Sequence, residues 1–143
     1  GWTIDGSTAR IRAQELKDAY EVSAPSIDTE ARLLSGGNLQ RLILAREISS
    51  EPGLMVAVQP TRGLDVGAIE TVHKLLLEQR AKGMAVLLIS EDLDEILMLA
   101  DRVAVIYEGR ISPSIPVEEA EVAQLGLMMT GSSAAAAADE ARA

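Results

Sequence analysis

Two short, uninterrupted aliphatic runs constrain the fold of this chain more than any other feature. Leu54–Val58 and Ala85–Ile89 contain no polar residue, and solid runs of this kind indicate parallel strands that are covered on both faces. Between them the periodicity predicts a helix over Val66–Lys82, with Asp65 as its N-cap and Gly83 after its end. Strand, helix and strand in this order predict an α/β fold, in which a parallel sheet is flanked by helices.

Helical periodicity and a further aliphatic run extend this pattern toward both ends. Before the first strand, the sequence predicts a helix over Thr8–Tyr20 and a helix that Ser35-Gly36-Gly37 opens and that runs to about Ser49. After the second strand, it predicts a short helix from Asp92 to Ala100, a third strand at Val103–Tyr107 and a last helix over Val117–Met129. Parallel sheets carry their chemistry at the carboxyl ends of the strands. Gln59 and Glu91 follow the first two strands, and they are therefore candidate site residues.

Composition and charge exclude several classes of function. The chain has 143 residues, a net charge of -9 and no cysteine. Without cysteine there are no thiolate metal sites, and the remaining ligands favour oxygen-bound cations such as magnesium over zinc. The acidic balance disfavours direct binding to nucleic acid, which clustered Lys and Arg would provide. No apolar run approaches the roughly 20 residues that cross a bilayer, so a cytosolic chain is expected.

The segment Leu34–Arg41 is the strongest local signal. Ser35 is a natural N-cap, Gly36 and Gly37 let backbone N–H groups approach a ligand closely, and the following helix points its positive end toward them. This combination favours an anion site of the kind that binds phosphate. A flexible entry into the helix is the alternative interpretation of the same residues.

Two more motifs follow in a fixed order. The first strand leads into Gln59-Pro60-Thr61-Arg62-Gly63-Leu64-Asp65, and the second leads through Leu88-Ile89 into Ser90-Glu91-Asp92. Together with Leu-Ser-Gly-Gly-Asn, these motifs resemble the ATP-binding subunits of ABC transporters over about Ala9 to Arg110. In that family the order is the signature motif, the Walker B strand, the D-loop and a switch histidine. Asn38 and the Ser90–Ile96 segment are similar to the second ATPase half of simple-sugar and nucleoside importers.

The resemblance implies a P-loop NTPase-like fold and a division of the chain. Residues 1–50 would be part of the helical subdomain that carries the signature motif. Residues 51–130 would be the C-terminal part of the RecA-like core, and residues 131–143 a low-complexity tail of Gly, Ser and Ala. No G-x-x-x-x-G-K-[ST] sequence of the Walker A type occurs in the chain. The chain also begins at Gly1 without Met, and a C-terminal fragment of a longer ATPase domain is expected.

The resemblance also assigns site residues, and several depart from the family pattern. Val58 stands where the Walker B Asp would hold magnesium, so no metal ligand is expected in this chain. Gln59 takes the place of the Glu that activates water, and an amide has no basic carboxylate to accept a proton. Glu91 aligns with the switch histidine, and its charge would repel phosphate. Asp65 aligns with the D-loop Asp, although capping of the next helix accounts for it equally well.

The resemblance implies that this chain contributes residues in trans to the ATP site of another domain. In the family two ATPase domains face head to tail, so Ser35, Gly36, Gly37 and Asn38 would complete the site for ATP and Mg²⁺ of a second ABC ATPase half. The expected whole is an ATPase that drives import of a sugar or nucleoside at the cytoplasmic face of the membrane. Its partners would be permease subunits and, indirectly, a solute-binding protein. The isolated chain is predicted to be inactive.

Two alternatives keep the fold but change the role. One is a regulatory or scaffold ABC domain that no longer contacts nucleotide. The other is a soluble ABC-type ATPase of DNA repair or translation, against which the acidic charge and the Gly63–Gly67 stretch count. His73 is predicted to be a partly exposed residue in the middle of a helix, and the carboxylates at 91, 92, 94 and 95 are predicted to cap and solvate a helix rather than bind a cation.

Overall fold

The computed structural model describes residues 5–131, which form two compact units. The first unit ends at Ile89 and the second begins at Ser90. The predicted boundary at residue 50, between the helical part and the sheet part, lies inside the first unit. The predicted low-complexity tail lies outside the described residues except for Gly131.

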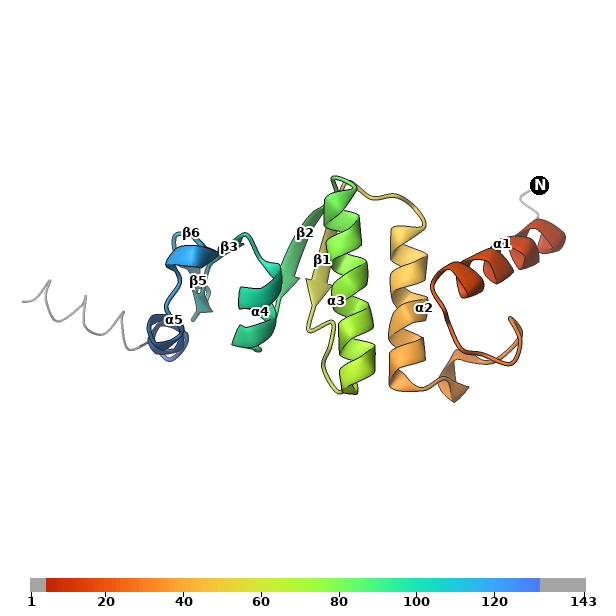
Figure 1. Cartoon of the computed structure of the whole chain (residues 1–143), viewed down its shortest axis with the longest axis horizontal. Helices are drawn as coiled ribbons and strands as arrows, with labels where there is room; N and C mark the ends of the chain where they lie inside the picture. The colour runs from red at the N-terminus through yellow and green to blue at the C-terminus, as the bar shows by residue number, and fades with distance from the viewer. Residues whose placement is uncertain (1–4, 132–143) are drawn as a thin grey trace, which may run out of the picture. The chain divides into compact units, whose positions relative to one another are not determined.

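The first unit is built around two parallel strands (Figure 1). Its elements are α1 (Gly6–Ala19), the 3₁₀ turn η1 (Ala31–Leu33), α2 (Gly36–Ile48), β1 (Leu54–Val58), α3 (Val66–Ala81) and β2 (Ala85–Ile89). The register of β1 and β2 runs from Leu54 opposite Ala85 to Val58 opposite Ile89. The predicted strands, the crossover helix between them and their parallel pairing are confirmed.

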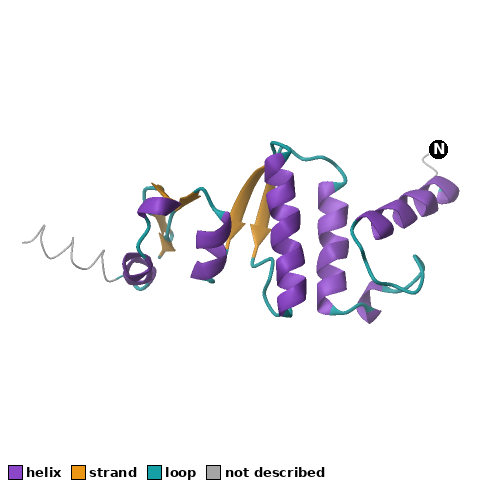
Figure 2. Cartoon of the chain, in the orientation of Figure 1, coloured by secondary structure: helices purple, strands orange, loops and turns teal. Residues whose placement is uncertain are grey.

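Three helices pack in successive layers on one face of this sheet. α3 contacts β2, α2 contacts α3, and α1 contacts α2 (Figure 2). The core between these layers contains one face of β1 and the inner faces of α2 and α3; its members are Met55, Ala57, Leu44, Ala45, Ile48, Ala68, Val72 and Leu76. On α2, Leu39, Leu42 and Ile43 are each more than a third exposed. One side of α2 therefore has no cover within the first unit.

The other face of the sheet is apolar and exposed. Leu54, Val56 and Val58 of β1 are 55 to 60% exposed, and Leu87 and Ile89 of β2 are 52% and 42% exposed. The register places these five side chains on one face, because residues that pair across parallel strands point the same way. Within the first unit the packed helices lie on the opposite face, so these five side chains are not covered.

The second unit is a set of short hairpins between two helices. It contains α4 (Leu93–Leu99), then β3 (Arg102–Val103) paired antiparallel with β6 (Ile115–Pro116), and β4 (Ile106–Tyr107) paired antiparallel with β5 (Arg110–Ile111). The 3₁₀ turn η2 (Val117–Glu119) leads into α5 (Val122–Met129). Leu125 of α5 is 1% exposed and is a centre of this unit's core.

Two predictions for this unit need correction. The run Val103–Tyr107 is not a third strand of the parallel sheet. It divides at Val105, whose N–H donates to Ser112 Oγ and whose carbonyl accepts from the Ser112 N–H, both at 2.9 Å. The last helix begins at Val122 rather than Val117, because a 3₁₀ turn occupies the first residues. Glu108 and Gly109 form the turn between β4 and β5, and both have positive φ, as a tight hairpin requires.

The N-cap of α1 makes that helix sensitive to acid. Hydrogen bonds from the Ser7 and Thr8 side chains and backbone lower the pKa of Asp5 from 3.8 to about 2. Because the folded-state pKa lies below the unfolded one, the cap stabilises α1 above about pH 4, and this contribution is lost as the pH falls toward about 2. We expect NMR chemical shifts to show α1 fraying over this range, and less in Asp5→Asn, whose cap does not titrate. Equal fraying in both proteins would contradict this account.

Candidate functional site

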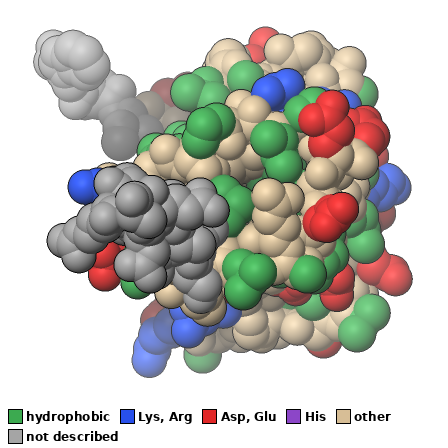
Figure 3. All heavy atoms as spheres, turned by 90° about the vertical axis from the view of Figure 1, so that its left-hand side faces the viewer, with side chains coloured by type: hydrophobic (Ala, Val, Ile, Leu, Met, Phe, Trp, Pro, Cys, Tyr) green, Lys and Arg blue, Asp and Glu red, His purple; other side chains and the backbone are tan. Residues whose placement is uncertain are grey.

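Lys and Arg side chains form no large basic face on the side of the molecule that Figure 3 shows. In the view of Figure 3, Lys and Arg lie singly or in small groups among acidic and apolar side chains. Among residues 5–131, no helix has the length and apolar character needed to span a bilayer. The candidate binding groups described below are therefore backbone N–H groups and small polar side chains.

The start of α2 presents donors to solvent. Ser35 is the N-cap, with φ −64° and ψ 159°, and its hydroxyl oxygen accepts from the Asn38 N–H at 3.4 Å. The N–H groups of Gly36 and Gly37 belong to the first turn, where a helix offers no internal acceptors. Ser35 and Gly36 are exposed, and Gly37 is half-buried. The predicted helix start at Ser35 is confirmed, and its donors and the positive end of the helix dipole are suited to an anion.

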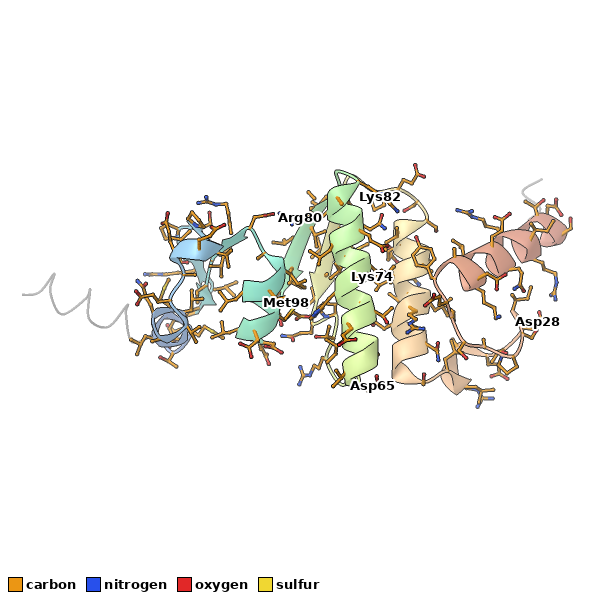
Figure 4. The ribbon with its side chains drawn as sticks, in the orientation of Figure 1. Asp28, Asp65, Lys74, Arg80, Lys82 and Met98 are labelled. Carbon is orange, nitrogen blue, oxygen red and sulfur yellow. The ribbon has the colours of Figure 1, made fainter. Side chains whose placement is uncertain are left out.

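The connection from β1 to α3 is a tight turn that begins at Gln59. Gln59 has a φ of +48°, its N–H donates to the Ile89 carbonyl at 2.8 Å, and its carbonyl accepts from the Arg62 N–H at 3.2 Å. Asp65 then caps α3 by accepting from the Ala68 N–H at 2.9 Å. Figure 4 shows Asp65 at the N-terminal end of α3, where the chain arrives from β1. Asp65 therefore has the capping role that the sequence offered as one of two interpretations.

The starts of α2 and α3 lie against each other. A Cβ added to Gly37 would lie 2.8 Å from Ala68 Cβ, and one added to Gly36 would lie 3.6 Å from Leu64 Cδ2. The two helices also begin at the same end of the first unit (Figure 1). The Ser35–Asn38 segment and the turn after β1 consequently form one edge, at the carboxyl end of β1.

Arg41 joins these elements one turn further along α2, although its sequence position gave it no predicted role. Its guanidinium donates to the Glu21 carbonyl at 2.9 Å and to Thr71 Oγ1 of α3 at 3.1 Å. Thr71 Oγ1 in turn donates to the Gly67 carbonyl at 2.9 Å. The helical spacing of Gly37 and Arg41 could have placed both on one face of α2, but their partners on α3 are set by tertiary packing.

The end of β1 does not fit a magnesium ion. Val58, at the predicted Walker B position, is 60% exposed and has no oxygen in its side chain, and Gln59 offers an amide. Among residues 5–131 no group of three His, Asp or Glu side chains is placed to hold a metal. Val58 and Gln59 therefore supply no carboxylate at this strand end, either as a metal ligand or as a base.

Glu91 belongs to the second unit, where it is exposed. It precedes Asp92, whose Oδ1 accepts from the Asp94 and Glu95 N–H groups at 3.0 and 3.3 Å and so caps α4. His73 lies half-buried in the middle of α3, as expected. Ser35–Asn38, Gln59 and Asp65 thus all belong to the first unit, and Glu91 belongs to the second.

Relatives with curated functions match most of the chain. The guanosine import ATP-binding protein of Bacillus subtilis is 55% identical over 121 residues, and the glucose import ATP-binding protein of Haloferax volcanii is 50% identical over 133 residues. These alignments cover 85% and 92% of the chain. The chain spans about a quarter of the length of each relative, 24% in both cases. No protein-family model matches the chain.

Solved structures give the same fold. A dimeric ATP-binding cassette in a post-hydrolysis state, bound to ADP and Pi, has a TM-score of 0.68 and 25% identity, with 81% of this chain and 50% of that chain covered. A nucleotide-free cassette from an ABC transporter has a TM-score of 0.68 and 26% identity, with 80% and 45% covered. The fold is that of an ABC-type ATP-binding cassette. The chain belongs to this family, and its homologues are ATP-binding proteins of nucleoside and sugar importers.

Proposed function

We propose that this chain acts as part of the ATP-binding component of an ABC importer, and that it donates the start of α2 to an ATP site whose other half belongs to a partner. The proposal rests chiefly on the exposed donors at Ser35 and Gly36, at the positive end of α2. The dimeric state and the bound ADP and Pi of the related cassette support it. Donors that are held in place before the reaction stabilise charge that develops on a transferring phosphoryl group.

The division of labour follows from what this chain lacks. Val58 and Gln59 have no carboxylate to bind magnesium or act as a general base. In this proposal the partner provides the phosphate-binding loop, the metal site and the water-activating carboxylate of the shared ATP site. The strand end of this chain is then hydrolytically weak. Glu91, in the position of the switch histidine, adds a negative charge that disfavours phosphate. The isolated chain is expected neither to bind Mg-ATP tightly nor to hydrolyse it.

The setting follows from the relatives. Their printed names describe import of guanosine, glucose and nucleosides, and we assign this chain to the import of a small solute of the sugar or nucleoside class. Its partners are then a second ABC ATPase half and membrane permease subunits, with a solute-binding protein acting indirectly. This places the chain at the cytoplasmic face of the membrane, held there by the permease.

A cysteine footprint tests the contribution in trans. The chain has no cysteine, so Ser35→Cys introduces a single thiol of nearly the same size in this segment. In the assembled ATPase, we expect ATP to slow alkylation of this thiol at least about tenfold, because a bound phosphate and the partner would cover it. Ser26→Cys, in the exposed loop before η1, is the matched control and should react at the same rate with and without ATP. Labelling of Ser35→Cys that ignores ATP would contradict the proposal and favour the regulatory role.

A further inference from the structure

The hydroxyl of Ser35 receives two hydrogen bonds from a single residue. Ser35 Oγ accepts from the Asn38 side-chain amide at 2.9 Å and, more weakly, from the Asn38 backbone N–H at 3.4 Å. A serine hydroxyl has two lone pairs and one proton to donate. With both lone pairs engaged toward α2, the remaining hydrogen-bonding capacity of Ser35 is its O–H, which is free to donate away from the helix.

The orientation of the Asn38 amide is itself determined. Its oxygen Oδ1 accepts from the backbone N–H of Ser23 at 2.8 Å. Because a backbone N–H can only donate, the oxygen must face Ser23, and the NH₂ group must therefore face Ser35. A flipped amide would place two donors against each other at Ser23.

The two residues that precede Ser23 are both held in place. Val22, next to Ser23, is 4% exposed, and its N–H donates to the Lys17 carbonyl at 2.9 Å. The Glu21 carbonyl accepts from Arg41, which follows Asn38 by three residues on α2. Residues at this spacing share a helix face, so α2 holds the 21–23 segment at two successive positions. The Asn38 side chain thus forms a hydrogen-bonded bridge between the 21–23 segment and the Ser35 hydroxyl.

We propose that Asn38 is a positioning residue: its side chain directs the Ser35 hydroxyl proton outward, toward a phosphate oxygen, and does not itself contact the nucleotide. This inference rests on the proposed function, and it assigns a specific task within it. Both polar atoms of the Asn38 side chain are engaged inside the protein, and the residue is half-buried, whereas Ser35 is exposed. The group that meets the ligand is the hydroxyl, and the amide acts through it.

A double-mutant cycle in the assembled ATPase tests this role. We expect Asn38→Ala to lower kcat for ATP about tenfold, with KM changed less than about twofold, because a hydroxyl free to rotate donates poorly in the transition state. In a Ser35→Ala background the same Asn38→Ala change should alter kcat less than about twofold, since its only route of action is gone. Gln14→Ala, which truncates a hydrogen-bonded amide on exposed α1, is the control and should leave turnover unchanged.

Asn38→Asp supplies a second variant of the same shape. It keeps an oxygen for the Ser23 N–H, so the loop contact and the fold are retained, but its other oxygen would draw the Ser35 proton inward. We expect kcat to fall at least as far as in Asn38→Ala, and far-ultraviolet circular dichroism to stay unchanged.

The outcomes distinguish the positioning role of Asn38 from the proposed function, in which Ser35 contributes to a partner's ATP site. A loss from Asn38→Ala that persists in the Ser35→Ala background, or a raised KM, would show direct contact with nucleotide and overturn the positioning role. Wild-type turnover in Asn38→Ala and Asn38→Asp, with Ser35→Ala impaired, would also overturn it while leaving the proposed function in place. If Ser35→Ala alone has no effect on turnover, the proposed function itself fails.

Discussion

Replacing Gly37 with valine is expected to lower the free energy of unfolding of the first unit by about 3 kcal/mol. A Cβ at this position would lie only 2.8 Å from Ala68 Cβ. That neighbour sits directly on the backbone of α3 and cannot swing aside, so the two helices would have to separate. Urea titration, followed by hydrogen exchange of the amides in α2 and α3, measures the loss in the unit concerned.

Gly36 provides the matched control for this prediction. A Cβ there would meet Leu64 Cδ2 at 3.6 Å, an ordinary contact, so Gly36→Ala should change the stability by less than about 1 kcal/mol. Ala68→Gly should also recover part of the loss in Gly37→Val, because it removes the opposing Cβ. If Gly36→Ala and Gly37→Val were equally stable, the close approach of α2 and α3 would not be a property of the protein.

The same close approach shows which part of the site lies beyond prediction from sequence. Ser35 and Asp65 were recognisable as N-caps because a cap depends on residues within one turn of chain. The contact between Gly37 and Ala68 joins residues that are far apart in sequence, and a glycine in a loop-to-helix entry has several local explanations. The hydrogen bond from Ser23 to Asn38 was unpredictable for the same reason, since its donor is a backbone group in an irregular loop.

The fold, too, could be predicted only where the local sequence determines the structure. The strands Leu54–Val58 and Ala85–Ile89 were predicted with the bounds that the structure has, because each is an unbroken aliphatic run between clear turn signals. Val103–Tyr107 was equally aliphatic, yet it forms parts of two antiparallel pairs. Local hydropathy could not distinguish these two kinds of aliphatic run. Val103–Tyr107 is divided by the two hydrogen bonds between Val105 and Ser112, and Ser112 lies beyond the hairpin turn.

The largest effect on activity is expected from a charge placed at the start of α2. Ser35→Asp and Ser35→Asn both supply a side-chain oxygen to the N–H groups of the first turn, and the two residue types are equally good N-caps. The free energies of unfolding of the two variants should therefore agree within about 0.5 kcal/mol. They differ in charge, because aspartate would place a carboxylate where the phosphate of a partner's nucleotide is expected to lie.

We expect ATP turnover of the assembled ATPase to fall at least about 100-fold in Ser35→Asp, and by about tenfold or less in Ser35→Asn, which loses only the hydroxyl donor. The repulsion of two anions at close range accounts for the difference, and raised salt should weaken it only slightly in a site that excludes water. Ser50→Asp, just beyond the opposite end of α2, controls for the added charge and should leave turnover unchanged. Equal turnover in the aspartate and asparagine variants would mean that no phosphate approaches this helix start, and the anion site inferred at Ser35 and Gly36 would have to be abandoned.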